Sequence, residues 1–157
     1  MAPVVADSSA LIALQRIGRL ELLHGLFGEI AVPPAVAREV ERGGLELPPW
    51  VRVRSLQETP ARGLPSRKLG EGEREAIDLA FELGGAQVIL DDLSARSVGR
   101  ERGLEVVGTA AVLYLAKRRG LIEAVRPSLD ALLADGFRLS PAVYSAILEA
   151  AGEDESR

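Results

Sequence analysis

Cysteine is absent from this 157-residue chain, and histidine occurs only once, as His24. Without cysteine there are no disulfides, thiolate zinc sites or cysteine nucleophiles, and any histidine chemistry depends on one residue. No apolar run approaches the roughly 18 residues that a membrane helix needs. The chain begins Met1-Ala2-Pro3 and goes straight into an apolar run, with no basic segment before it. We therefore expect no secretory signal, no membrane association and a cytoplasmic protein.

An excess of positive charge is also missing, because the net charge is -4. A protein of this composition that binds RNA has to do so through local basic patches. The hydrophobic content of 47% suits one compact domain. We expect that domain to span residues 1–151, followed by a polar tail at 152–157.

Short apolar runs alternate with amphipathic segments along the chain. The pattern predicts strands at residues 4–6, 29–32, 50–56, 87–90 and 105–107. It predicts helices at residues 10–15, 19–26, 35–41, 73–83, 93–102, 109–119, 122–133 and 141–150, and a mobile loop at 57–70. Alternation of this kind predicts an α/β fold, a three-layer α/β/α sandwich with a central parallel sheet.

Asp7 stands where the first apolar run ends and helical periodicity begins. It could cap the helix, although Ser8 or Ser9 could do the same. It could also accept a phosphoryl group, or bind a metal at the carboxyl edge of the sheet, where ligands of such folds bind. Position alone does not choose among these roles.

Two further acids belong to predicted helices. Glu39 lies at the edge of the apolar stripe of its helix. Glu73 is in line with Ile77 and Ala80, so we expect it to point inward, whereas Glu75 should face solvent. The general role of an acid in a first helical turn is its favourable interaction with the helix dipole, but this role does not predict an inward direction.

Asp91 and Asp92 follow the buried run at residues 87–90. One of them should cap the next helix, and the other then lies at the end of a strand, as Asp7 does. Four carboxylates at one edge repel unless protons or cations neutralise them, which favours Mg²⁺ or Mn²⁺. Such ions activate water for phosphodiester hydrolysis, so the expected substrate is nucleic acid.

Four segments in order carry a resemblance to a known family: VVADSSAL from residue 4, PAVAREV from 34, GEREAI from 72 and VILDD from 88. Together they resemble the motifs of the PIN-domain ribonucleases, and in particular a toxin-like, little-characterised prokaryotic branch of that family. The resemblance extends from about residue 4 to residue 120. It implies a divalent-metal-dependent endoribonuclease that cleaves single-stranded RNA with metal-activated water.

The resemblance also implies roles for individual residues. Asp7 and Asp91 would be the principal metal ligands, with Asp92 as the alternative to Asp91. Glu39 and Glu73 would complete the cluster, directly or through water. Hydrogen bonds from Ser8 or Ser9 would support it.

Two arginines, Arg96 and Arg100, lie four residues apart on the helix after Asp91, where they could hold phosphates or be ordinary solvated charges. A small antitoxin is the protein partner that the resemblance suggests. We also expect a homodimer, because the C-terminal segment carries many apolar residues: Leu129, Leu132, Leu133, Phe137 and Leu139.

Two other functions compete with the nuclease. One is a noncatalytic PIN-like module that binds a protein partner and whose acids form no working site. The other is a receiver-type domain with Asp7 in its acidic pocket. The receiver is disfavoured because no lysine stands at the end of a late strand.

Overall fold

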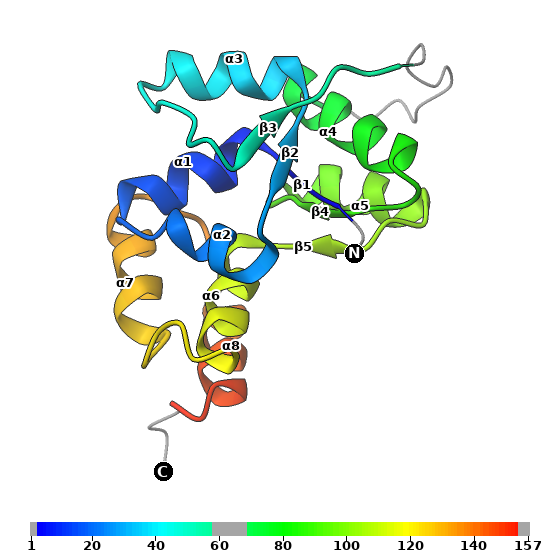
Figure 1. The fold of residues 1–157 in the computed structure, drawn as a ribbon. Coiled ribbons are helices and arrows are strands. Elements are labelled where there is room, and N and C mark those ends of the chain that lie inside the picture. The colour runs from blue at the N-terminus through cyan, green and yellow to red at the C-terminus, as the bar shows by residue number, and fades with distance from the viewer. Residues whose placement is uncertain (1–2, 58–68, 154–157) are drawn as a thin grey trace.

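The computed structural model describes residues 3–57 and 69–153. Within these residues, one parallel sheet has the strand order β3-β2-β1-β4-β5 (Figure 1). The strands are β1 (Val4–Ala6), β2 (Ile30–Val32), β3 (Val51–Val53), β4 (Gln87–Ile89) and β5 (Val106–Val107). Together with the helices they form a PIN-like α/β/α fold, which confirms the predicted fold class.

The direction of the sheet order reverses between β1 and β4. In this pair Val5 lies opposite Val88, and on the other side of β1 it lies opposite Ala31 of β2. Receiver domains have the order 2-1-3-4-5, so this sheet does not support the receiver interpretation. A reversal of strand order opens a crevice at the carboxyl ends of the strands, and ligands of such folds bind there.

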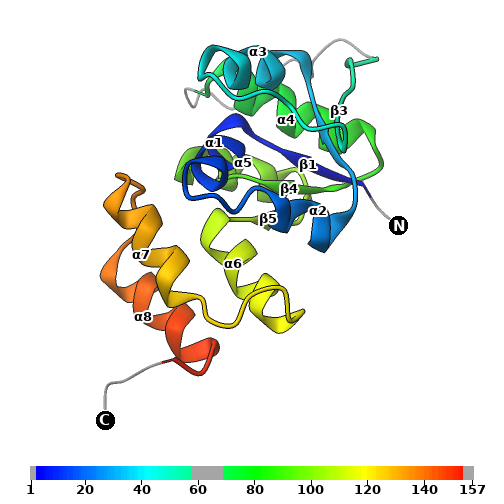
Figure 2. The ribbon, with the colours of Figure 1, turned by 60° about the vertical axis from the view of Figure 1, so that its left-hand side comes forward.

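The helices in the described part of the chain are α1 (Ser8–Arg16), α2 (Glu21–Phe27), α3 (Pro34–Arg42), α4 (Glu71–Glu82), α5 (Leu93–Glu101), α6 (Thr109–Arg118), α7 (Arg126–Ala134) and α8 (Pro141–Ala150). Helices α4 and α5 pack on the sheet, whereas α1 and α2 pack against α6. Helix α3 contacts both α4 and α1. Figure 2 shows α7 and α8 at the end of the molecule away from α3 and α4.

Local sequence explains most of these boundaries. The residues of β1 and β2 are all buried, as apolar strands covered on both faces should be. Gly18 separates α1 from α2 with a φ of 73°, a backbone conformation that glycine adopts without strain. Pro34 is the first residue of α3. An N–H at this position would have no partner within the helix, so proline costs no hydrogen bond there.

Two predicted elements are shorter than expected. The strand expected at 50–56 covers only Val51–Val53, because its neighbour β2 offers three residues for pairing. The helix expected at 122–133 begins only at Arg126. Pro127 lies in its first turn, the part of a helix that tolerates proline.

Glu153 is part of the folded structure, although the sequence places it in a polar tail. Its Oε2 accepts hydrogen bonds from the Val125 amide (2.7 Å) and from Lys117 Nζ (2.9 Å). Its Oε1 accepts from the Arg126 amide at 3.0 Å. The expected tail is therefore wrong at residue 153, and residues 154–157 lie outside the described part of the chain. Most of the loop expected at 57–70 also lies outside it.

Helix α4 buries Ala76, Ile77 and Ala80, as its apolar periodicity predicts, but two other residues depart from that pattern. Phe81 is 53% exposed, and the Arg102 guanidinium lies 4.5 Å from the centre of its ring. Asp78 is buried instead and accepts a hydrogen bond from Arg102 at 2.6 Å. A carboxylate can occupy this buried position because a cation of the neighbouring segment pairs with it.

The C-terminal apolar residues are largely covered within the monomer. Leu129 and Leu132 are buried, and Phe137 and Leu139 are partly buried against the core. The expected surplus of exposed apolar surface is therefore smaller than the sequence suggests. No helix in the described ranges is both long enough and apolar enough to cross a membrane.

Candidate functional site

Asp7 directly follows β1, where the strand order reverses between β1 and β4. Only 3% of its surface is exposed. The Asp7 amide donates to the Ile89 carbonyl of β4 at 3.1 Å, which continues the sheet by one residue. The carboxylate accepts hydrogen bonds from the Ser8 amide (2.7 Å) and from the Ser9 hydroxyl (3.3 Å). Asp7 is therefore the N-cap of α1, and both serines contact it.

The charge of Asp7 is unfavourable in this position. Burial raises the pKa of Asp7 to about 7, although the hydrogen bond from Ser8 opposes the rise. The nearby carboxylates of Glu73 and Glu39 raise it further. Hydrogen bonds from the start of a helix lower the pKa of an aspartate, so the raised value reflects first the burial of Asp7 and then the two neighbouring carboxylates.

Glu39 approaches this site from α3. Its Oε1 accepts a hydrogen bond from the Ser8 hydroxyl at 2.9 Å, so Ser8 contacts the carboxylates of both Asp7 and Glu39. Glu39 also fits against the first turn of α4, where a Cβ on Gly72 would lie 2.1 Å from Glu39 Oε1. Only glycine leaves room for the carboxylate in this position.

Glu73 lies in the first turn of α4, where it is half-buried. Burial raises the pKa of Glu73, the Gly70 amide lowers it, and the carboxylates of Asp92 and Glu39 raise it. The Gly70 amide donates to Glu73 Oε1 at 3.0 Å, so Glu73 also caps its own helix. The side chain thus combines a capping role with proximity to other acids.

Asp91 faces a different helix from the other acids. It accepts hydrogen bonds from the Thr109 amide (2.9 Å) and the Thr109 hydroxyl (2.5 Å) at the start of α6. Burial raises the pKa of Asp91, while the Thr109 bonds and the charge of Arg96 lower it. Asp92 is exposed and caps α5 by accepting from the Ala95 amide at 3.0 Å. Each member of the acidic pair therefore accepts a hydrogen bond from the first turn of a helix, Asp91 from α6 and Asp92 from α5.

The two candidate RNA-binding arginines differ in their surroundings. Arg96 is half-buried and donates to the Leu90 carbonyl at 3.3 Å. Burial lowers the pKa of Arg96, Arg100 lowers it further, and Asp91 raises it. Arg100 is exposed. Of the two, only Arg96 lies among the groups of the candidate site.

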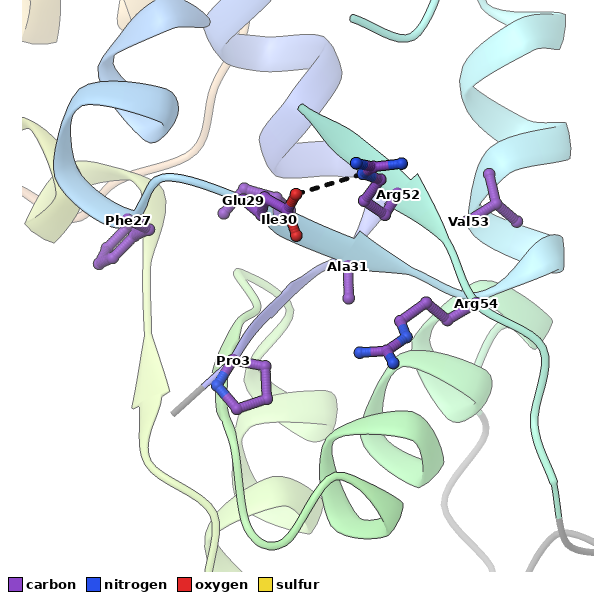
Figure 3. Close-up of a pocket in the computed structure, with 8 residues that line it drawn as sticks. All are labelled: Pro3, Phe27, Glu29, Ile30, Ala31, Arg52, Val53 and Arg54. Atoms are coloured by element: carbon purple, nitrogen blue, oxygen red, sulfur yellow. Dashed lines mark hydrogen bonds and ion pairs between the residues drawn. The ribbon is translucent and has the colours of Figure 1, made fainter. Parts of the chain in front are cut away.

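A pocket of about 540 Å³ lies away from these acids. Figure 3 shows Pro3, Ala31 and Arg54 around the same space, while Arg52 pairs with Glu29 at 3.3 Å. Pockets are a usual starting point in locating a site, but none of the predicted acids lines this one. We assign the candidate site to the acids because Asp7 is buried, Glu39 and Glu73 are half-buried, and the Ser8 hydroxyl contacts the carboxylates of both Asp7 and Glu39.

The donor chemistry of the acidic site suits a hard divalent cation. Carboxylate oxygens are the ligands that Mg²⁺ and Mn²⁺ prefer, and a cation would offset the repulsion that raises the pKa of Asp7. In the described ranges, however, no three Asp, Glu or His side chains lie close enough to hold an ion. Holding an ion with three or more of these residues would therefore require their side chains to move closer together.

These features define an α/β/α protein with an acidic site at the carboxyl edge of a parallel sheet. A family model described as the PIN domain matches residues 3–153, so the chain belongs to the PIN-domain family. Members of that family are generally nuclease-like and typically use divalent metals.

Comparison of structures supports the same fold. The chain is similar to a PilT N-terminus domain protein from the hyperthermophilic archaeon Sulfolobus solfataricus P2, with a TM-score of 0.54 and 22% sequence identity. The match covers 69% of this chain and 88% of the archaeal chain. No curated protein matches the chain significantly.

Three residues of the site were not anticipated from the sequence. Thr109 binds Asp91, Gly72 makes room for Glu39, and Glu75 accepts from the Ala35 amide at 3.1 Å. The expectation that Glu75 is solvated is therefore wrong. Glycine at position 72, directly before Glu73, could have indicated that another segment approaches α4 closely. The contacts of Thr109 and Glu75 could not be read from the sequence, because they depend on how distant helices pack.

Proposed function

We propose that this PIN-domain protein is a divalent-metal-dependent endoribonuclease that cleaves single-stranded RNA. The observation that carries the proposal is the burial of Asp7 beside Glu39 and Glu73, which raises the pKa of Asp7 to about 7. A structural helix cap does not need two further carboxylates nearby. A metal-binding edge does, because the ion requires several oxygen ligands.

The residues that would hold Mg²⁺ or Mn²⁺ are Asp7, Glu39, Glu73 and Asp91, with Asp92 as the alternative to Asp91. When bound, the ion would make water a nucleophile near neutral pH and stabilise the leaving oxygen. Hydrogen bonds within the chain would orient these carboxylate ligands. Ser8 holds the carboxylates of Asp7 and Glu39, and Ser9 holds the other oxygen of Asp7.

Arg96 is the candidate for contact with phosphate. Its guanidinium has five N–H groups, and the bond to the Leu90 carbonyl uses one of them. Its position beside Asp91 would bring a phosphodiester near the acids, which a net charge of -4 would otherwise repel. Arg100, being exposed on the same helix, would add a weaker electrostatic contribution.

Metal response and RNA cleavage test this proposal in wild type and Asp7→Asn. We expect millimolar Mn²⁺ to raise the wild-type Tm, since the assembled site exists only in the folded state, and to raise the mutant Tm much less. Asp7→Asn should also abolish Mn²⁺-dependent cleavage of single-stranded RNA. Glu46→Gln, which changes an exposed acid remote from the site, should behave as wild type.

The second candidate is a noncatalytic PIN-like module that binds a protein partner. Two observations favour it: Asp91 is bound to Thr109, and no three potential ligands among the described residues are close enough to hold an ion. A wild-type Tm indifferent to Mn²⁺ and Mg²⁺, together with no RNA cleavage, would make this the better interpretation. A toxin role with a small antitoxin rests on the family resemblance, and a short antitoxin-like gene beside this one would support it.

A further inference from the structure

Helix α3 begins without a cap of its own. Pro33 occupies the N-cap position and has no polar side chain, and Pro34 has no N–H. The Ala37 amide donates to the Pro33 carbonyl at 3.1 Å, but the Ala35 amide comes too early in the helix for an intrahelical bond. Because Ala35 is only 1% exposed, its N–H needs a partner from the protein.

Glu75 of α4 provides that partner. Its Oε1 accepts from the Ala35 amide at 3.1 Å, and its side chain is half-buried between the two helices. A carboxylate at a helix N-terminus is also favoured by the helix dipole. The helices α3 and α4 also share the Arg38–Glu71 ion pair, whose side chains are 55% and 65% exposed, so it adds little stability.

This contact bears directly on the acidic site. Ala35 and Glu39 are four residues apart, so they lie on the same side of α3, one turn from each other. The Glu39 carboxylate fits against Gly72 of α4 with no room for a methyl group. A shift of the start of α3 along α4 would therefore move the Glu39 carboxylate relative to Asp7 and Glu73.

We propose that Glu75 is a positioning residue: its hydrogen bond to the Ala35 amide fixes α3 on α4 and holds the Glu39 carboxylate at the metal-binding edge. The inference rests on the proposed metal-dependent function. It assigns Glu75 no contact with metal or substrate. Its role is to place a ligand that belongs to another helix.

Two substitutions separate the hydrogen bond from the charge. Glu75→Gln keeps a carbonyl oxygen at the same reach but removes the charge, whereas Glu75→Asp keeps the charge and withdraws the oxygen by one methylene. Mn²⁺ affinity is measured from the dependence of Tm on Mn²⁺ concentration. We expect Glu75→Gln to bind Mn²⁺ within about twofold of wild type and Glu75→Asp to bind about tenfold more weakly, the effect of one lost hydrogen bond.

Kinetics provide a second readout. At a fixed, subsaturating Mn²⁺ concentration, Glu75→Asp should lower kcat for single-stranded RNA and leave KM nearly unchanged, since RNA contacts are not altered. Glu71→Gln and Glu71→Asp are the matched controls, because Glu71 is an exposed acid in the same helical turn. Both should resemble wild type, and any small effect of Glu71→Gln measures the loss of charge together with the exposed Arg38 ion pair.

The possible failures are distinguishable. If wild type responds to Mn²⁺ and Glu75→Asp responds equally, the positioning role is wrong while the proposed function stands. If Glu75→Gln loses as much Mn²⁺ affinity as Glu75→Asp or more, then keeping the hydrogen-bond acceptor does not preserve the site, and the inference is again overturned. A wild-type Tm that does not change with Mn²⁺ concentration overturns the proposed function and this inference together.

Discussion

Asp7 links pH to the stability of the metal-free protein. Its pKa is about 7 in the folded state, well above the ordinary aspartate value of 3.8. Between these values the folded state holds a proton that the unfolded state releases, so stability falls as pH rises from about 4 to 7. The loss is on the order of 4 kcal/mol, by the free energy that corresponds to a shift of this size.

We predict that in EDTA the wild-type free energy of unfolding decreases over this pH range and that Asp7→Asn flattens the decrease. Asparagine keeps the cap of α1 but carries no charge. Urea unfolding at several pH values between 4 and 8 measures the effect. Equal pH dependence in the two proteins would show that Asp7 does not have a raised pKa.

Asp91 and Asp92 should differ in the kind of damage that their loss causes. Asp92→Ala removes the cap of α5, which should cost about 1 kcal/mol in stability and leave most of the RNA cleavage. Asp91→Asn should abolish cleavage while folding is retained. Thermal melts and cleavage assays on both variants test the assignment, and greater loss of activity in Asp92→Ala would reverse it.

Among the helices, α7 depends on a residue that is distant in sequence. Glu153 accepts hydrogen bonds from the Val125 and Arg126 amides at the start of α7 and from Lys117 of α6. The Lys117 ammonium also donates to the Ala151 carbonyl at 2.6 Å. This network connects the end of α8 to α6 and α7.

We predict that Glu153→Ala destabilises the protein by about 2–3 kcal/mol, because it leaves the Val125 and Arg126 amides without their acceptor and removes the carboxylate that pairs with the partly buried Lys117. Glu149→Ala, which removes an exposed acid on α8, should change stability by less than about 0.5 kcal/mol. Chemical denaturation of the two variants measures the difference. Equal stability would mean that the Glu153 contacts contribute nothing net.

Glu153 also has a pH dependence of opposite sign to that of Asp7. Burial acts to raise its pKa, but the hydrogen bonds from Val125, Arg126 and Lys117 outweigh this effect and lower it. Its contribution to stability is therefore present above the ordinary glutamate pKa of 4.5 and is lost as pH falls through the lowered value. Acid unfolding should begin at higher pH when Glu153 is replaced by alanine.

For the molecule as a whole, association into a homodimer stays a prediction. Exposed apolar residues remain near the C-terminal helices, with Val143 of α8 at 45% and Leu121 at 43% exposure. Light scattering should give a dimer mass at micromolar concentration, and Val143→Lys should shift the equilibrium toward monomer if α8 lies in the interface. A monomer mass at every concentration would contradict the prediction.

The sequence alone determined the order of the elements and the strand ends that Asp7 and Asp91 follow. Apolar periodicity indicated the strands and helices because each segment that buries one face must carry apolar residues at the spacing of that face. Asp7 and Asp91 could be placed at one edge because parallel strands bring their carboxyl ends together. The motifs around Asp7, Glu39, Glu73 and Asp91 resembled those of the PIN family, to which the chain belongs.

Only the tertiary structure decided which partner each polar group has. Glu75 was expected in solvent but caps α3, and Glu153 was expected in a tail but caps α7. Each outcome depends on how two elements distant in sequence pack, which no local pattern contains. A carboxylate binds whichever unpaired amide or cation the packing brings within about 3 Å, so its role follows from the assembled fold.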